Sequence, residues 1–172
     1  MTATSGPLRR KITAASLTGA VFAILLGIIV PDPFGGTTPG GFWNALTLSV
    51  PLYLMYSFPV ILLFGVPASL LADFLAARLS HGFRKPGAEL MISGVLHVAF
   101  GLVALGYGVA AALLGFLADR LLRKKPAPGW PDTLKSLAVP ALVWLFFMFI
   151  VYLREFSADL PALLQTVNPF RN

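Results

Sequence analysis

Three residues that could support chemistry, followed by a glycine, recur at intervals of four: Glu89, Ser93, His97 and Gly101. Helical residues four apart lie on one face, so this spacing predicts a shared surface. An ionisable side chain inside a membrane is energetically costly, so His97 is a candidate functional residue. Because imidazole titrates near neutral pH, His97 could relay protons. We favour instead a neutral His97 that is hydrogen-bonded to a hydroxyl or carbonyl group of a neighbouring helix.

Two acidic residues precede basic residues near the ends of apolar segments. Asp73 comes shortly before Arg78, and Asp119 comes directly before Arg120. These acids could gate a small cytoplasmic vestibule. The interpretation that we favour is pairing with basic side chains at the level of the headgroups, where exposed pairs contribute only about 0–1 kcal/mol.

Signatures of catalysis and of metal binding are missing from the sequence. It contains no Gly-x-Ser-x-Gly, His-Glu-x-x-His or P-loop motif, no cysteine and only two histidines. A nucleophile–base pair or a metal cluster is difficult to assemble from these residues. We therefore expect no catalytic residues, no metal, no cofactor and a protein that is not an enzyme.

The composition indicates a membrane protein. Of the 172 residues, 57% are hydrophobic and 12% are charged, whereas soluble domains carry about 25% charged residues. Lipid is the solvent in which such an apolar exterior is stable. The net charge is +6, but the basic residues lie at the ends of apolar segments. We therefore expect contacts with the bilayer and its anionic lipid headgroups, and no nucleic-acid partner.

The apolar segments predict an all-α, polytopic transmembrane bundle that forms a single membrane domain, residues 1–172. A helix needs about 20 apolar residues to cross a hydrocarbon core of about 30 Å. Five spans are favoured, over residues 12–30, 43–77, 86–104, 108–123 and 134–153.

Three basic clusters predict the orientation of these spans. They are Arg9–Lys11, Arg78–Lys85 and Arg120–Lys125. Such clusters stay on the cytoplasmic side of a bilayer, which places the N-terminus inside. Keeping the last two clusters on the same side requires two crossings between them, with a turn at Leu105–Gly108. The alternative is one long tilted helix there and four spans in all.

Prolines and small residues mark two helix surfaces. Prolines recur every eight residues in the second span, at Pro51, Pro59 and Pro67. Each removes a backbone donor and should bend the helix. Small residues recur every four residues in the first span, at Gly19, Ala23 and Gly27. They allow two helices to approach closely, and we favour packing within the chain over a homodimer face.

Three stretches of the middle of the chain carry a resemblance to known proteins. They are Phe64–Phe74 (FGVPASLLADF), Leu96–Leu102 (LHVAFGL) and Phe116–Leu122 (FLADRLL). Together they resemble small uncharacterised multi-pass membrane proteins of Bacillus-type bacteria, a group with no established activity. The resemblance implies a multi-pass protein of a bacterial plasma membrane.

The leading functional hypothesis is a small structural or regulatory membrane protein that acts through helix–helix contacts. Its partner would be another membrane protein or a second copy of the chain. This hypothesis rests on the abundant small residues and on the lack of an enzyme motif. The alternative is a small permease or proton-coupled carrier, in which His97 and the proline-rich second span line the path. An intramembrane enzyme is the least favoured.

Overall fold

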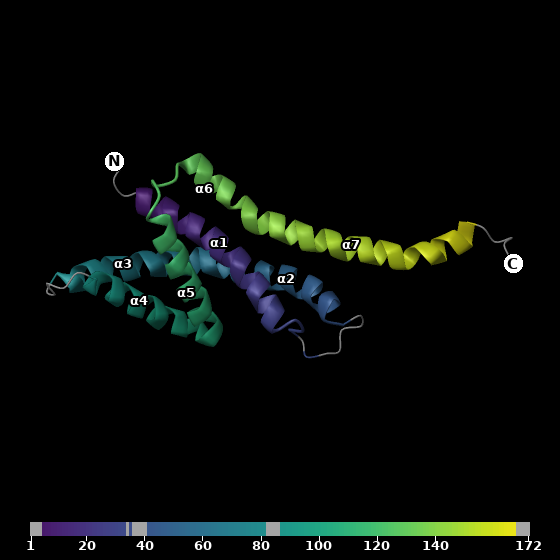
Figure 1. Cartoon of the computed structure of the whole chain (residues 1–172), viewed down its shortest axis with the longest axis horizontal. Coiled ribbons are helices and arrows are strands. Elements are labelled where there is room, and N and C mark those ends of the chain that lie inside the picture. The colour runs from purple at the N-terminus through teal and green to yellow at the C-terminus, as the bar shows by residue number, and fades with distance from the viewer. Residues whose placement is uncertain (1–4, 34, 36–40, 82–86, 168–172) are drawn as a thin grey trace.

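The computed structural model describes residues 5–33, 35, 41–81 and 87–167, and every regular element among them is helical (Figure 1). The prediction of an all-α fold is therefore confirmed for this part of the chain. The elements are α1 (Ser5–Ile29), α2 (Gly41–Val60), the π-helix η1 (Ile61–Gly65), α3 (Val66–Ser80), α4 (Ala88–Gly101), the 3-10 helix η2 (Leu102–Ala104), α5 (Leu105–Leu122), α6 (Trp130–Ser136) and α7 (Ala138–Val167).

Four helical segments of the described chain are long and apolar enough to cross a membrane. They are Gly6–Ile29, Gly41–Ser80, Ala88–Leu122 and Trp130–Asp159. Large apolar side chains are widely exposed along them, as on α7 with Phe146, Phe149 and Tyr152. Such an exterior is stable in lipid and not in water, so the structure is compatible with the expected membrane location.

The second apolar segment is helical over all 40 residues from Gly41 to Ser80, a length of about 60 Å at 1.5 Å per residue. Its irregularity is a π-helical turn between Pro59 and Pro67. There the amide of Val66 donates to the carbonyl of Ile61, five residues earlier. π-Helical turns often occur at functional sites. The π-helical turn lies between two of the three prolines at which bends are predicted, Pro59 and Pro67.

The third apolar segment folds back on itself, so that α4 and α5 lie side by side (Figure 1). The chain reverses through η2 and Leu105, whose backbone angles are φ 56° and ψ −150°. The predicted turn at Leu105–Gly108 therefore begins about three residues earlier. Gly101 and Gly108 form the closest approach, because a Cβ atom on Gly108 would collide with the Gly101 carbonyl oxygen.

Helix α1 occupies the centre of the bundle and contacts α2, α3, α5, α6 and α7. Its stripe of small residues faces α2 within the same chain. A Cβ atom on Gly19 would lie 2.6 Å from Phe58, and one on Gly27 would lie 2.6 Å from Val50, while Ala23 is completely buried. The small residues therefore let α1 and α2 pack closely.

Candidate functional site

Charged side chains from three helices meet at one end of the bundle. This charged cluster consists of Arg10 and Lys11 from α1, Asp73 from α3, and Asp119, Arg120 and Arg123 from α5. Lys11 is only 3% exposed and Asp119 only 1%. Burial of charges is costly unless they are paired, so these two side chains require close partners of opposite charge.

Lys11 is at the centre of this charged cluster. Its Nζ atom lies 2.7 Å from Oδ2 of Asp73 and 2.9 Å from Oδ2 of Asp119, and it donates to Oγ of Ser69 at 2.6 Å. These three contacts use all three donors of the ammonium group. Lys11 thus lies inside the bundle, where two carboxylates hold its charge, although it belongs to the basic cluster Arg9–Lys11.

The two carboxylates are also held by arginines. Nε of Arg10 donates to Oδ1 of Asp119 at 2.8 Å. Arg123 bridges both acids, with Nη2 2.6 Å from Oδ2 of Asp73 and Nε 3.1 Å from Oδ2 of Asp119. Asp119 does pair with basic residues, as expected, but as a buried group of the bundle and not as an exposed pair at the headgroups.

Arg120 is held less closely than the other basic residues of the charged cluster. Its Nη2 atom is 3.7 Å from Oδ1 of Asp73, and its guanidinium group lies over the ring of Phe116 at 4.9 Å. Phe116 in turn lies 5.1 Å from the ring of His97. Four basic side chains thus surround two acids, which leaves the charged cluster with a net charge of +2.

A chain of hydrogen bonds connects Lys11 to His97. Oγ of Ser69 accepts from Lys11 and lies 2.8 Å from Nε2 of His97. Nδ1 of His97 lies 2.7 Å from the carbonyl oxygen of Ser93. A carbonyl can only accept, so Nδ1 carries a hydrogen, and in the neutral ring Nε2 accepts from the Ser69 hydroxyl. The favoured interpretation of His97, a hydrogen bond to a hydroxyl group of a neighbouring helix, agrees with this geometry.

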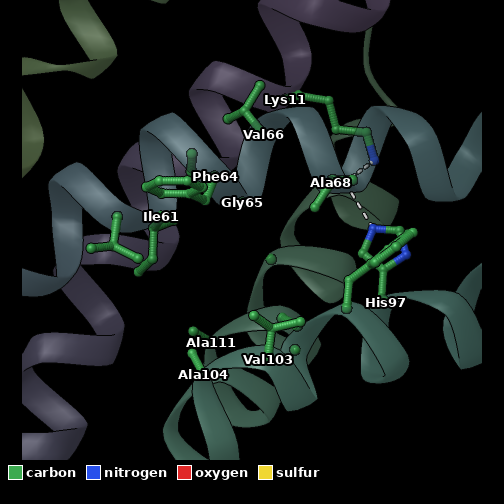
Figure 2. Close-up of a pocket in the computed structure, with 18 of the residues that line it drawn as sticks. Lys11, Ile61, Phe64, Gly65, Val66, Ala68, His97, Val103, Ala104 and Ala111 are labelled. Atoms are coloured by element: carbon green, nitrogen blue, oxygen red, sulfur yellow. Dashed lines mark hydrogen bonds between the residues drawn. The ribbon is translucent and has the colours of Figure 1, made fainter.

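Ser93 connects His97 to Asp73 of the charged cluster. The hydroxyl group of Ser93 donates to Oδ1 of Asp73 at 2.7 Å. Lys11, Ser69, His97, Ser93 and Asp73 therefore form a closed polar circuit between α1, α3 and α4. Figure 2 shows Lys11 and His97 approaching α3 from opposite sides, with dashed lines that meet between them.

A cavity of about 500 Å³ lies against this circuit. Its walls come from α1, from the end of α2, from the π-helical turn with the start of α3, from α4 and η2, and from α5 (Figure 2). Among the described residues that line it, Lys11, Ser69 and His97 are the polar ones. Val60, Phe64 and Val103 line it and are 49%, 70% and 87% exposed. The cavity thus has a polar end inside and an apolar rim outside.

Most of the polar residues singled out in the sequence come together here. Asp73, Ser93, His97, Asp119 and Arg120 all belong to the charged cluster or the polar circuit. Glu89 does not join them. It is exposed in the first turn of α4, and its only described interaction with the site is a longer-range electrostatic one with Arg120. Within the described parts of the chain, no three His, Asp or Glu residues are grouped to hold a metal ion.

Sequence reasoning missed Lys11, Arg10, Arg123 and Ser69. A signal for Lys11 was present, because it lies four and eight residues before Ala15 and Gly19 and so extends the small-residue stripe. A residue on that stripe must face a neighbouring helix, whatever its charge. Ser69 and Arg123 are likewise each four residues from an acid of the charged cluster.

Comparison of the chain with protein-family models, with curated proteins and with solved structures finds no match in any of the three. The features that bear on function are therefore the geometry of the cavity and of the charged groups at its inner end.

Proposed function

We propose that this protein is a small multi-pass membrane carrier that binds a lipophilic solute in the cavity between α1, α3, α4 and α5. The observation that carries the proposal is an apolar cavity of about 500 Å³ whose inner end is formed by Lys11, Ser69 and His97. Ligand sites in proteins are typically apolar cavities of about 300–1,000 Å³ with a few polar groups that orient the ligand.

The cost of the polar circuit supports a functional role. Ionisable groups within membrane-spanning segments are expensive and commonly mark substrate or proton pathways. An alternating series of donors and acceptors, such as Lys11, Ser69 and His97, can pass a proton along its hydrogen bonds. We therefore propose that solute movement is coupled to a proton held on His97.

The irregular second segment supports a carrier more than a purely structural protein. Its π-helical turn, Ile61–Gly65, lines the cavity with Ile61, Phe64 and Gly65. Broken or irregular helices form the binding sites of many transporters. The small-residue stripe, on which the partner-helix hypothesis rests, is occupied by α2.

We propose five membrane crossings with a cytoplasmic N-terminus, in a bacterial plasma membrane. The beginning of α1 and the end of α5 carry basic residues that meet Asp73 of α3 in the charged cluster, at one end of the bundle. Basic residues are retained on the cytoplasmic side. The fold-back between α4 and α5 supports two crossings in the segment that carries them.

A pair of adjacent alanines provides the test. Ala111 lines the cavity, whereas Ala110 is exposed and is not among the described lining residues. The purified protein is screened for solutes that raise its thermal stability, and the uptake of these solutes is measured in proteoliposomes with and without a pH gradient. We expect Ala111→Phe to abolish both binding and uptake, and Ala110→Phe to change neither. Uptake that is equal in the two variants, or the absence of uptake of every stabilising solute, would overturn the proposal.

A further inference from the structure

Among the described side chains at the polar end of the cavity, one hydrogen-bonding position is left for a ligand. The three donors of Lys11 are used by Ser69, Asp73 and Asp119, and Nδ1 of His97 is used by Ser93. Oγ of Ser69 accepts one hydrogen bond, from Lys11, and donates its hydrogen to Nε2 of His97. A hydroxyl oxygen has two lone pairs, so among the described contacts one lone pair of Ser69 is unused. The head of the ligand must therefore be a donor.

The apolar rim indicates where the ligand comes from. Val60, Phe64 and Val103 line the cavity and are also exposed on the apolar surface of the bundle. A ligand dissolved in the bilayer can enter past these side chains without crossing a polar barrier. At about 30 Å³ for a group the size of a water molecule, the cavity of about 500 Å³ has room for a chain of roughly twelve carbons and a small head.

From these observations we infer that the cavity takes a single-chain carboxylic acid from the bilayer, head first, and that the acid passes its proton through Ser69 to His97. This inference rests on the proposed carrier function and names its substrate class. The acid enters uncharged, and its O–H group donates to the unused lone pair of Ser69. The acid O–H bond breaks as a new O–H bond forms on Ser69, and the original Ser69 hydrogen forms the N–H bond on Nε2 of His97.

The products of this transfer are a carboxylate and an imidazolium ion, with no change in total charge. The charged groups that face His97 are Lys11 from α1, Asp73 from α3 and Asp119 from α5. Asp73 and Asp119 favour the imidazolium form, whereas burial of the ring and the charge of Lys11 oppose it. Lys11 favours the carboxylate, and the carboxylate and the imidazolium ion form together, so that each stabilises the other. An alcohol could occupy the same lone pair but is too weak an acid to give up its proton.

The two histidines of the chain make the proton transfer directly observable. The full-length protein, labelled with nitrogen-15 in histidine and carrying His81→Gln, is placed in lipid nanodiscs that contain no free acid. We expect one protonated and one unprotonated ring nitrogen on His97. After dodecanoic acid is added, both ring nitrogens of His97 should be protonated, whereas dodecanol should bind without this change. Dodecyltrimethylammonium, which has no hydrogen to donate, should bind at least tenfold more weakly than the acid.

Two substitutions at Ser69 test the relay. Ser69→Ala removes the lone pair and should prevent the acid from protonating His97, and Ser69→Thr keeps a hydroxyl group and should restore the response. The spectrum of the wild-type Ser69 protein remains decisive if Ser69→Ala fails to fold. An acid that binds and leaves His97 neutral, or a cationic amphiphile that binds as tightly as the acid, would overturn the inference.

The outcomes also separate this inference from the proposed function. If dodecanoic acid protonates His97 but is never transferred across proteoliposomes, the carrier is refuted and the binding site stands. If another solute is carried in an Ala111-dependent way while dodecanoic acid has no effect on His97, the substrate class is refuted and the carrier stands.

Discussion

Replacement of Lys11 by methionine should destabilise the bundle strongly, although the sequence places Lys11 among bases expected at a membrane surface. Methionine has a similar length and no charge, so the change removes one ammonium group and its bonds to Asp73, Asp119 and Ser69. A lysine that faced water and headgroups would lose little on this substitution, since surface changes usually stay within about 0.5 kcal/mol.

The magnitude follows from the partners that remain. Breaking a buried ion pair by removing one member typically costs about 3–5 kcal/mol. Without Lys11, Asp119 keeps Arg10 at 2.8 Å and Arg123 at 3.1 Å, and Asp73 keeps Arg123 at 2.6 Å. Neither carboxylate is left unpaired, so we expect a loss of about 3 kcal/mol, at the lower end of that range.

The assay is reversible unfolding of the purified protein in mixed micelles, followed by tryptophan fluorescence. Lys124→Met is the matched control, because Lys124 is exposed just beyond α5. A double-mutant cycle of Lys11→Met with Asp119→Asn should give a coupling energy of about 0.5–3 kcal/mol. A loss in Lys11→Met no larger than that in Lys124→Met, together with zero coupling to Asp119, would refute the buried charged cluster.

Three further predictions concern the fold. Gly108→Ala should destabilise the protein by about 1–3 kcal/mol through overpacking, because a Cβ atom there collides with the Gly101 carbonyl oxygen. Gly106→Ala is the control and should be neutral or stabilising, since a Cβ atom at Gly106 would have nothing within 4 Å. Equal melting temperatures of the two variants would contradict the close approach of Gly108 to Gly101. Leu105→Gly should raise the melting temperature, because Leu105 has φ 56° and ψ −150°, near a region of backbone angles that glycine almost alone occupies. A lower melting temperature of this variant would argue against backbone strain at Leu105. A reporter fused to the carboxyl end should be active only outside the cytoplasm, and activity inside would contradict five crossings.

The apolar helices could be predicted from the sequence because a helix that crosses a membrane must satisfy a simple rule of length and composition. The fold-back in the third segment could also be predicted, since basic residues flank the segment on both sides. The exact position of this fold-back could not be predicted. Flexible glycines at Gly106 and Gly108 suggested the turn, yet Leu105 takes the unusual backbone angles, and Gly108 serves the close approach to Gly101.

The site was harder to predict than the helices because its members come from distant parts of the chain. Asp73, His97 and Asp119 stand out as polar residues in apolar segments. Lys11 does not, because it belongs to a basic run of the kind that normally flanks a membrane helix. Only its register with Ala15 and Gly19 shows that it faces inward, and only the packing of α1 against α3 and α5 shows which acids it meets.

The central claim, a solute cavity that ends at Lys11, Ser69 and His97, can be tested by site-directed labelling. The chain contains no cysteine, so single cysteines at Ala111 and Ala110 report on the cavity and on the exposed face of α5 without background. The measurement is the rate at which a small membrane-permeant maleimide labels each cysteine, with and without a stabilising solute. The cavity predicts that the solute strongly slows labelling at position 111 and leaves position 110 unchanged. Equal effects at the two positions, or no effect at either, would contradict it.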